Sequence, residues 1–509
     1  MTGHVRTRVV VVGGGPVGLL VAAELGAFGV DTVVLEAAAE VSMRPRATTL
    51  HARALQCLVR RGYLPELRPR AMGGAESTAP FHFGGVEGLP LSVPAGEPGP
   101  LLKRAQADLE RMLEERAVAA GARILRRHRV TEVTQDADGV RAVAEGPEGM
   151  LTVTGEFLVG ADGARSTVRD LAGIGSQEWP ATVSAMAGLV ELAEDKALEA
   201  GWHRTARGWL VVKHEPGGGT HLRTLNCSRT HARRDEPLTL QELREEVSWL
   251  AGRHVDMERG RWLTRFSDFS RLADRYRAGR VLLVGDAAHV HFPIGGQGLS
   301  TGLQDAIDLG WKLALTVQGQ AGDGLLDSYD LERRPAARRV IDNTQAQLAL
   351  MRPGVEVDAL RSVFAEMLAS EGPGSRVGDL VSAQDTVLPP RFGPSPWEGR
   401  FLPNVALRTP QGETDLIGLL GEGGPLLVLF GGPDTLRIEE QAGPWADVVR
   451  VVRAETVASV PCEAVLLRPD GYVGWAPGGA DLEAALEACF GQRPKGGAGD
   501  AGQPRAAGS

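Results

Sequence analysis

The sequence of 509 residues has little cysteine and no long apolar run. Its four cysteines (Cys57, Cys227, Cys462 and Cys489) form neither a C-x-x-C pair nor a zinc-type spacing. This excludes a disulfide framework and a zinc finger, so we expect no metal site and thiols buried as small apolar residues. Because no stretch of about 20 apolar residues occurs, we expect no transmembrane helix.

Positive charge is not in excess either. Lysine and arginine number 55 against 64 aspartates and glutamates, which gives a net charge of −9. This composition offers no electrostatic reason to expect nucleic acid as a partner. The apolar run Val9–Val12 is too short for a signal peptide and ends directly in three glycines. We therefore predict a cytoplasmic globular protein, with no membrane partner, that is a monomer or a homodimer.

The first informative feature is a strand, a Gly-rich turn and a helix near the N-terminus. Val9–Val12 is a β-branched run typical of a strand buried on both faces. Gly13, Gly15 and Gly18 then form a G-x-G-x-x-G turn before a helix pattern over residues 17–29. In such a turn the backbone can approach a pyrophosphate, and the helix N-terminus offers N–H groups and partial positive charge.

A second strand is predicted over residues 31–36, and it ends in Glu36. A carboxylate about twenty residues after the turn can accept hydrogen bonds from both ribose hydroxyls of an adenosine. It would repel a 2′-phosphate, which disfavours NADP at this site.

A second Gly-rich loop lies far along the chain. A strand over residues 280–284 leads into Gly285-Asp286, and Gly295-Gly296-Gln297-Gly298 opens a helix that extends to about residue 316. The Asp286 carboxylate suits a polyol hydroxyl, and the loop amides suit an anion. Two Gly-rich helix starts indicate a long ligand that is contacted twice, and FAD is such a ligand. A shorter motif, Asp162-Gly163 to Arg169, follows a strand over residues 156–161.

Other patterns predict further elements. Helices are expected over residues 49–62, 104–120, 240–252, 269–276 and 482–489, and strands around residues 123–133, 140–144, 208–213, 221–225, 425–430, 447–452, 464–467 and 472–475. Residues 353–396 indicate a connection, and the Gly/Ala/Pro-rich tail from residue 493 is expected to be disordered. No internal repeat is found.

The three motifs in this order resemble the single-component FAD-dependent aromatic hydroxylases, the para-hydroxybenzoate hydroxylase-like class. The resemblance covers about residues 5–345 and includes Ser328–Pro335. Val465–Trp475 resembles the end of the thioredoxin-like domain of the phenol hydroxylase and bacterial aromatic polyketide hydroxylase branch. Because no C-x-x-C is present, that domain should have no redox role.

The resemblance implies an α/β fold: a Rossmann-type FAD-binding domain, an inserted sheet-based substrate domain and a C-terminal thioredoxin-like domain. The expected bounds are residues 1–174 and 279–397 (FAD domain in two parts, the second with a helical linker), 175–278 (substrate domain), 398–492 (thioredoxin-like domain) and 493–509 (tail).

The resemblance also implies the cofactor contacts. The expected FAD-binding residues are Gly13, Gly15, Pro16, Val17 and Gly18 (pyrophosphate turn), Glu36 (ribose), Arg46 (diphosphate), Gln106 (ribityl region), Val130 (adenine, through its backbone), Asp162, Asp286 (ribityl chain), Pro293, Gly296, Gly298, Leu299 and Ser300 (flavin edge). Relatives often have Asn at the position of Ser300, which leaves that one contact open.

The implied reaction is a monooxygenation. NADPH or NADH reduces FAD, O₂ adds at flavin C4a, and the hydroperoxide transfers one oxygen atom to an aromatic substrate, here a polycyclic polyketide of secondary metabolism. The alternatives are a Baeyer–Villiger or an antibiotic-inactivating flavin monooxygenase and, more distantly, a non-catalytic flavin-binding module.

No side chain is assigned as the catalytic base. His289, His291 and Arg53 are candidates by position, although a structural hydrogen bond is the simpler interpretation of both histidines. Aromatic residues Trp179, Trp202, Trp209 and Phe266 could line a substrate pocket, with core packing as the default.

Overall fold

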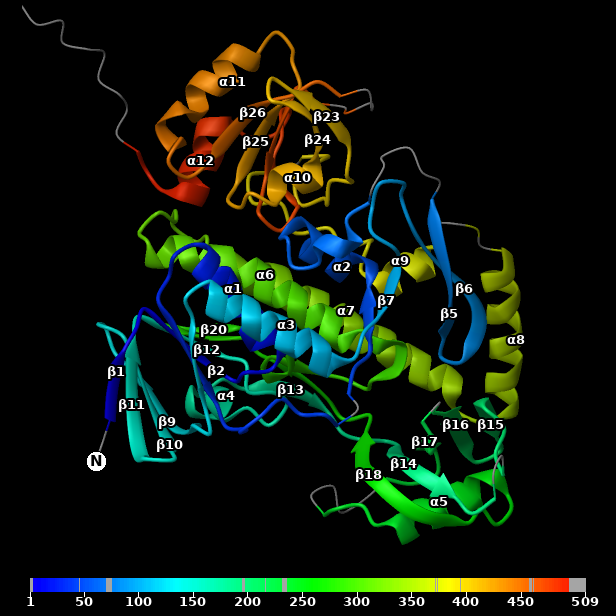
Figure 1. Ribbon diagram of the computed structural model, residues 1–509. Coiled ribbons are helices and arrows are strands. Elements are labelled where there is room, and N and C mark those ends of the chain that lie inside the picture. Colours follow the sequence, from blue (N-terminus) through cyan, green and yellow to red (C-terminus); the bar gives the residue numbers. More distant parts are fainter. Residues whose placement is uncertain are drawn as a thin grey trace, which may run out of the picture. The chain divides into compact units, whose positions relative to one another are not determined.

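The computed structural model describes residues 3–44, 46–69, 76–194, 197–215, 217–230, 236–370, 372, 374–393, 395–456, 460 and 462–493. Its contacts divide the chain into two compact units. Unit 1 is Met1–Gly310 with Tyr329–Thr386, and unit 2 is Trp311–Ser328 with Val387–Ser509. Figure 1 labels the elements of both. In these described ranges no helix is long and apolar enough to cross a membrane, and no cluster of three metal-binding side chains occurs. All four cysteines are free thiols.

A six-stranded sheet organises unit 1. Its order is β20 (Arg277–Ala278), β21 (Val281–Leu283), β12 (Phe157–Gly160), β2 (Val9–Val12), β3 (Thr32–Glu36) and β8 (Arg123–Arg126). All four valines of β2 are buried, as the β-branched run predicts. Strands β21, β12, β2, β3 and β8 are parallel. Because carboxyl ends of parallel strands share one edge, the three predicted motifs begin at that edge.

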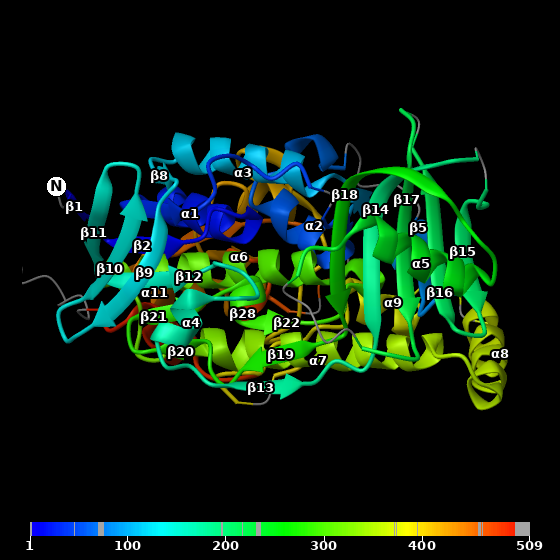
Figure 2. The same ribbon diagram turned by 90° about the horizontal axis from the view of Figure 1, so that it is seen from below.

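Helices α1 (Pro16–Ala27) and α3 (Gln106–Ala119) lie side by side in unit 1 (Figures 1 and 2). The helix predicted over residues 49–62 begins only at Ala52, as α2 (Ala52–Arg60). The preceding residues form β4 (Thr49–His51), which pairs with β7 (Leu101–Lys103). That long-range pairing is invisible to a local helix pattern.

A four-stranded sheet follows the order β1 (Gly3–Arg6), β11 (Gly149–Gly155), β10 (Val140–Gly146) and β9 (Arg129–Gln135). The strand predicted over residues 123–133 is in fact two, β8 and β9, because residues 127 and 128 make a turn between them. Strand β11 was not predicted, since its glycines at both ends read as loop.

A five-stranded antiparallel sheet is built from the order β15 (Gly201–Thr205), β16 (Gly208–His214), β17 (Thr220–Asn226), β14 (Ser184–Leu192) and β18 (Met257–Ser267). Helix α5 (Leu240–Ala251) covers one face of it through Leu243 and Val247, which pack on Met186, Leu210 and Leu222 (Figure 2). The opposite face packs against the second Gly-rich loop, as described below.

A capping box starts α5. Thr239 Oγ1 accepts from the Glu242 N–H, and Glu242 Oε2 accepts from the Thr239 N–H at 2.9 Å. The hydrogen bond from the Thr239 N–H lowers the pKa of Glu242 to about 2, and the Thr239 hydroxyl and Arg265 act in the same direction. Desolvation opposes this shift but is smaller than the backbone contribution. The ionised carboxylate is therefore the form that the folded state prefers.

We expect Glu242→Ala to lower the free energy of unfolding at neutral pH by about 1 kcal/mol, because the side chain is partly exposed and its interactions are screened. The pKa of Glu242 lies below its unfolded value, so this contribution is complete above the ordinary glutamate pKa of 4.5 and is lost as the pH falls toward about 2. Urea unfolding at neutral pH and at a pH near the folded pKa of Glu242 measures this contribution. Glu245→Ala, on the exposed side of the same helix, is the control and should cost less at neutral pH.

The helix predicted over residues 269–276 is wrong. Ser270–Ala273 is strand β19, in a small sheet of order β13 (Ser176–Trp179), β19 and β22 (His289–Val290). The β19 residues pair with both neighbouring strands, so tertiary pairing overrides the local pattern.

The connection expected over residues 353–396 contains two helices, α8 (Val355–Ser370) and α9 (Arg376–Ser382). They pack on the hairpin of β5 (Ser77–Phe83) and β6 (Val86–Val93), whose Leu89 and Leu91 share a buried cluster with Leu368 and Val381. The other helices that position the site are α4 (Thr167–Leu171), α6 (Gly298–Val317) and α7 (Ser328–Met351).

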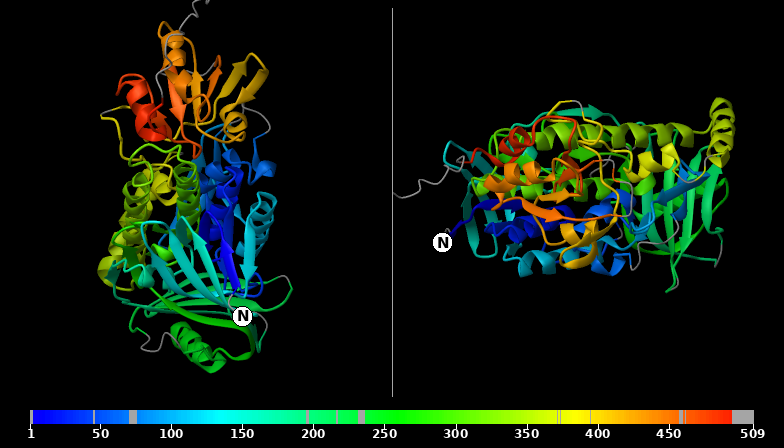
Figure 3. Two further views of the ribbon diagram at one scale, coloured as in Figure 1. Left: turned by 90° about the vertical axis from the view of Figure 1, so that its left-hand side faces the viewer. Right: turned by 90° about the horizontal axis from the view of Figure 1, so that it is seen from above.

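Unit 2 contains a four-stranded sheet of order β26 (Arg450–Arg453), β25 (Leu426–Leu429), β27 (Ala464–Leu467) and β28 (Val473–Trp475), with a hairpin of β23 (Ala406–Thr409) and β24 (Gly412–Asp415). Its helices are α10 (Leu416–Leu420), α11 (Thr435–Ala442) and α12 (Leu482–Phe490), and α11 and α12 lie together on one face of the sheet (Figure 3). The predicted strands and closing helix are confirmed within a few residues. The tail predicted from residue 493 lies outside the described residues beyond Arg493.

Candidate functional site

The three glycines of the first turn have different surroundings. A side chain at Gly13 would overlap the Ala161 carbonyl, and one at Gly18 would overlap the Gly13 carbonyl. A Cβ at Gly15 would meet no atom within 4 Å. Gly15 also begins α1 without a side-chain cap, and the first turn of α1 holds no acidic residue. The turn therefore leaves open space at a helix end where partial positive charge accumulates.

Val17 joins this turn to the second Gly-rich loop. A Cβ at Gly285 would lie 3.3 Å from Val17 Cγ1, and a Cβ at Gly302 would lie 2.8 Å from Val17 Cγ2. Close packing at these positions explains why glycine is needed there. The two Gly-rich segments, far apart in the sequence, are thus brought together in unit 1, as one long ligand contacted at both would require.

Asp286 lies in this second loop and has a free carboxylate. Its side chain is exposed, and no described residue makes a hydrogen bond or ion pair with it. Desolvation by the surrounding protein nevertheless raises the pKa of the Asp286 carboxyl, against the charges of His289 and Arg46. The exposed carboxylate is available to accept hydrogen bonds from a polyol.

A buried network holds the Asp286 loop. Asp305 accepts from His289 Nε2 at 2.7 Å, from Arg333 Nε at 2.8 Å and from the Gly285 N–H at 3.2 Å. All three side chains are almost fully buried. Although desolvation acts in the opposite direction, the charges of His289 and Arg333 lower the pKa of Asp305. The carboxylate thus fixes the backbone on the N-terminal side of Asp286.

Asp162 is used within its own motif. Its carboxylate accepts from Ser166 Oγ at 2.5 Å and from the Val168 N–H at 3.0 Å, which stabilises the start of α4. Desolvation raises the pKa of Asp162 despite these hydrogen bonds. From α4, buried Arg169 donates to the Ala287 carbonyl at 3.1 Å and so supports the Asp286 loop from a second side.

Glu36 shapes the first turn. Its two carboxylate oxygens accept from the Gly14 N–H at 2.5 Å and the Ala38 N–H at 2.6 Å. Each oxygen keeps a further lone pair, so these bonds do not preclude acceptance from ribose hydroxyls. The predicted ribose role remains a prediction.

Arg46 and Gln106 lie near the same loops. The Gln106 N–H donates to the Ala47 carbonyl at 3.1 Å, so the first residue of α3 is tied next to Arg46. Desolvation raises the pKa of Glu110, while the charge of Arg46 lowers it. Arg46 also acts on Asp286. One exposed guanidinium therefore lies within electrostatic reach of both α3 and the second loop, a position suited to a diphosphate.

His51 fixes the loop before α6. Gly295 and Gly296 have φ of +72° and +65°, which favours glycine at both. His51 Nε2 donates to the Gly295 carbonyl at 2.7 Å, and the His51 N–H donates to Ser300 Oγ at 3.0 Å. Ser300 thus anchors β4 to α6. Pro293, Gly298 and Leu299 lie in this same loop and helix start, whereas Val130 is buried in β9 opposite Ala144.

The three candidates for a catalytic base have structural partners. His289 is bonded to Asp305, and Arg53 donates to Gln56 and to the Ala383 and Gln384 carbonyls. His291 Nδ1 lies 2.9 Å from the Phe292 carbonyl, so this nitrogen carries the proton. Burial lowers the pKa of His291 to about 4, so the ring is neutral and only weakly basic at pH 7.

Trp202 and Trp209, two of the predicted pocket aromatics, belong to an aromatic row that reaches the second loop, whereas sequence reasoning missed its members His51, Phe81 and His82. Neighbouring ring centroids lie 5.4 Å apart for His51 and Phe81, 4.8 Å for Phe81 and His82, 4.7 Å for His82 and Trp202, and 6.0 Å for Trp202 and Trp209. The members come from β4, β5, β15 and β16, so only the fold assembles them.

The other two predicted pocket aromatics differ from each other. Phe266 stacks on Phe292 at 5.9 Å, beside the second loop. Trp179 instead lies under the Arg338 guanidinium at 4.9 Å in the small sheet.

Comparisons with known proteins agree with this geometry. Residues 6–344 match the family described as FAD binding domain, and residues 395–493 match aromatic-ring hydroxylase, C-terminal. The chain is 37% identical to the 12-dehydrotetracycline 5-monooxygenase/anhydrotetracycline 6-monooxygenase of Streptomyces rimosus, over 96% of this chain and 99% of that one.

Two further relatives widen the comparison. The dialkyldecalin synthase of Streptomyces rugosporus is 38% identical, over 95% of this chain and 98% of that one. The crystal structure of an aromatic hydroxylase from angucycline biosynthesis is similar at a TM-score of 0.86, with 33% identity, over 96% of this chain and 99% of that one.

Proposed function

Because the chain belongs to the family of FAD-dependent aromatic-ring hydroxylases, we propose that it inserts one oxygen atom of O₂ into a polycyclic aromatic polyketide. The enzyme is an FAD-dependent monooxygenase. The observation that carries the proposal is the meeting of the open turn at Gly15 with the free Asp286 carboxylate, joined through Val17.

These residues fit the cofactor. Open space at Gly15 and the uncapped N-terminus of α1 suit the pyrophosphate, with Arg46 as the nearby cation. Asp286 would bind the ribityl chain, and Glu36 the ribose. The Pro293–Ser300 loop would run along the flavin edge, where backbone N–H groups and the start of α6 stabilise negative charge. Val130 and Gln106 complete the proposed contacts, and Asp162 would act indirectly by holding α4.

Bound FAD would accept two electrons from a nicotinamide and, once reduced, would activate O₂. NADPH or NADH would be the reductant and supply two electrons, one oxygen atom would enter the substrate ring as a hydroxyl, and the other would leave as water. The chain contributes binding and orientation of the aromatic ring and exclusion of water. An electron-rich phenol is the expected substrate, because its ring can attack an activated oxygen.

We also propose the domain roles. The parallel sheet and its two Gly-rich starts would be a Rossmann-type FAD domain formed from residues 1–174 and 279–397. The sheet within residues 175–278 would be the inserted substrate domain. Residues 398–492 would be thioredoxin-like without redox function, since all cysteines are free and no C-x-x-C occurs.

The test is reductant consumption by the purified FAD-loaded protein. NADPH and NADH oxidation would be followed with and without a panel of polycyclic phenols and quinones that includes anhydrotetracycline. We expect at least one compound to accelerate oxidation and gain one oxygen. A ring hydroxyl in the product supports hydroxylation, whereas a new ester supports Baeyer–Villiger insertion.

A second candidate function is a redox-neutral cyclisation. The similarity to a dialkyldecalin synthase, at 38% identity, favours it. It predicts retained FAD and product formation without reductant or O₂. Incubating the FAD-loaded protein with an open-chain polyene, anaerobically and without NADPH, tests this second function separately.

Asp286→Ala should weaken FAD binding and leave the stability of the fold unchanged. Because the carboxylate has no partner among the described residues, the apoprotein should keep its melting temperature. FAD affinity should fall about tenfold to a hundredfold, as expected for a lost charge-assisted hydrogen bond. FAD titration by fluorescence quenching measures the affinity. Asp342→Ala, an exposed aspartate on α7, is the control and should bind FAD normally.

A further inference from the structure

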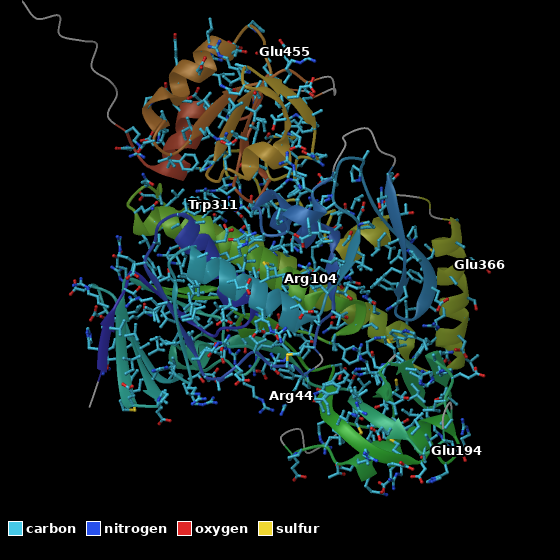
Figure 4. The ribbon with its side chains drawn as sticks, viewed as in Figure 1. Arg44, Arg104, Glu194, Trp311, Glu366 and Glu455 are labelled. Atoms are coloured by element: carbon cyan, nitrogen blue, oxygen red, sulfur yellow. The ribbon has the colours of Figure 1, made fainter. Side chains whose placement is uncertain are left out.

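Two cations in unit 1 have no carboxylate partner among the described residues. Lys103 ends β7, and its Nζ donates to Thr49 Oγ1 at 2.7 Å. Arg223 lies in the middle of β17 and makes no hydrogen bond or ion pair with the part of the chain that the structure describes. By contrast Arg104, labelled in Figure 4, pairs with Glu66 at 2.9 Å. Most arginines in the described ranges are likewise paired with a carboxylate, so a cation without such a partner is unusual in this part of the chain.

Both cations are exposed, and protein atoms nevertheless surround them closely enough to affect their titration. Each side chain is exposed to solvent, yet desolvation by the surrounding protein lowers the pKa of both. The charge of Arg223 further lowers the pKa of Lys103, so the two side chains lie within electrostatic reach of each other. Two like charges held together and desolvated are costly unless a ligand compensates them.

Arg223 lies on the sheet face that meets the second Gly-rich loop. Its strand neighbours are Ala187 on β14 and Val211 on β16, both small or aliphatic. Two residues along β17, on the same face, Leu225 packs in one buried cluster with Phe292 and Ile294. Arg223 therefore lies on the same sheet face as Leu225, which packs against the loop proposed to hold the flavin edge.

Lys103 lies beside the aromatic row. Its Nζ is 5.9 Å from the centre of the Phe81 ring, and Phe81 contacts His51, whose Nε2 donates to the Gly295 carbonyl. Burial lowers the pKa of His82, the next ring in the row, to about 4, so His82 adds no positive charge at pH 7. Rings at differing tilts and two cations thus approach the same loop, Lys103 through Phe81 and His51 and Arg223 through the sheet face of Leu225.

We propose that Lys103 and Arg223 are the specificity-determining pair that binds an ionised oxygen substituent of the planar aromatic substrate. The inference rests on the proposed function, and it names the substrate as an anionic aromatic, a phenolate, enolate or carboxylate. The aromatic row would contact the ring plane, and the cations would fix which edge of the ring faces the flavin.

Three probes that share one skeleton test the proposal: 2-hydroxyanthraquinone, 2-methoxyanthraquinone and anthraquinone-2-carboxylate. Their Kd values for the FAD-loaded protein would be measured from flavin absorbance changes, at a pH where the hydroxyl is ionised. We expect one or both anions to bind about 10- to 100-fold more tightly than the neutral ether. The stronger anion distinguishes a phenolate from a carboxylate site.

Variants then assign the preference to the two residues. Lys103→Met and Arg223→Met should each remove most of it, with an unchanged Kd for the ether. Lys103→Arg and Arg223→Lys should retain it. Lys213→Met is the matched control, because Lys213 lies on the neighbouring strand but pairs with Glu215 at 2.8 Å. This variant should bind all three probes like the parent protein.

Equal binding of the anions and the ether, no binding of any probe, or an anion preference that survives both Met variants would overturn the proposal. A selective rise in KM for NADPH over NADH in the Met variants would also overturn it, because the cations would then serve the nucleotide phosphate. FAD content and substrate-stimulated reductant consumption are separate readouts, so failure of the proposed function is recognised independently.

Discussion

Gly15→Val should give a folded protein that no longer retains FAD. A Cβ at this position meets no atom within 4 Å, and Gly15 is not among the positive-φ glycines, so a branched side chain is tolerated by the apoprotein. The same side chain would fill the space into which the pyrophosphate must fit. We expect FAD affinity to fall by about a hundredfold or more, in line with loss of several phosphate contacts.

Gly18→Val is the matched comparison. Its Cβ would overlap the Gly13 carbonyl and crowd Ala161, so the strand-to-helix turn itself must move. This variant should lose folding, whereas Gly15→Val should keep the apoprotein melting temperature. Circular dichroism melts and FAD titration separate the two effects. If Gly15→Val binds FAD normally, the pyrophosphate does not lie at this turn.

Asp305→Ala should be the most destabilising substitution outside the turn. It removes the carboxylate that accepts from Arg333, buried on α7, from His289 Nε2 and from the Gly285 N–H. Removing one partner of a buried ion pair typically costs about 3–5 kcal/mol. Denaturant unfolding of the apoprotein measures this cost.

FAD binding should weaken as well, because the Gly285 N–H no longer fixes the loop that carries Asp286. The comparison is Asp342→Ala, which breaks an exposed pair with Arg338 on the same helix. This control should cost less than about 0.5 kcal/mol. Equal destabilisation by the two substitutions would contradict the role assigned to the Asp305 network.

The strands and Gly-rich turns of the proposed cofactor side were predictable because their signals are local. A valine run followed at once by closely spaced glycines specifies a buried strand and a turn, and the structure places Val9–Val12 and α1 accordingly. Asp286 was found in the same way, from a strand that ends in Gly-Asp. Their meeting through Val17 was inferred only indirectly, from the length of the expected ligand.

The proposed substrate side was predictable only in part. Trp202 and Trp209 were expected as possible pocket aromatics. Lys103, Arg223 and the assembly of the whole row depend on separate strands, and no spacing in the sequence connects them. The wrong helix over residues 269–276 has the same cause, since β19 is defined by its partners rather than by its own pattern. His289 is the converse case, where the simpler expectation of a structural hydrogen bond is confirmed.

We propose that this chain uses FAD to place one atom of O₂ in an aromatic substrate. The most direct test is turnover of the FAD-loaded enzyme with NADPH under isotope-labelled O₂, with the panel compound that most stimulates reductant oxidation. We predict a product that carries one labelled oxygen, formed in step with the NADPH consumed. A product without label, or one that forms equally well without NADPH and O₂, would contradict the account.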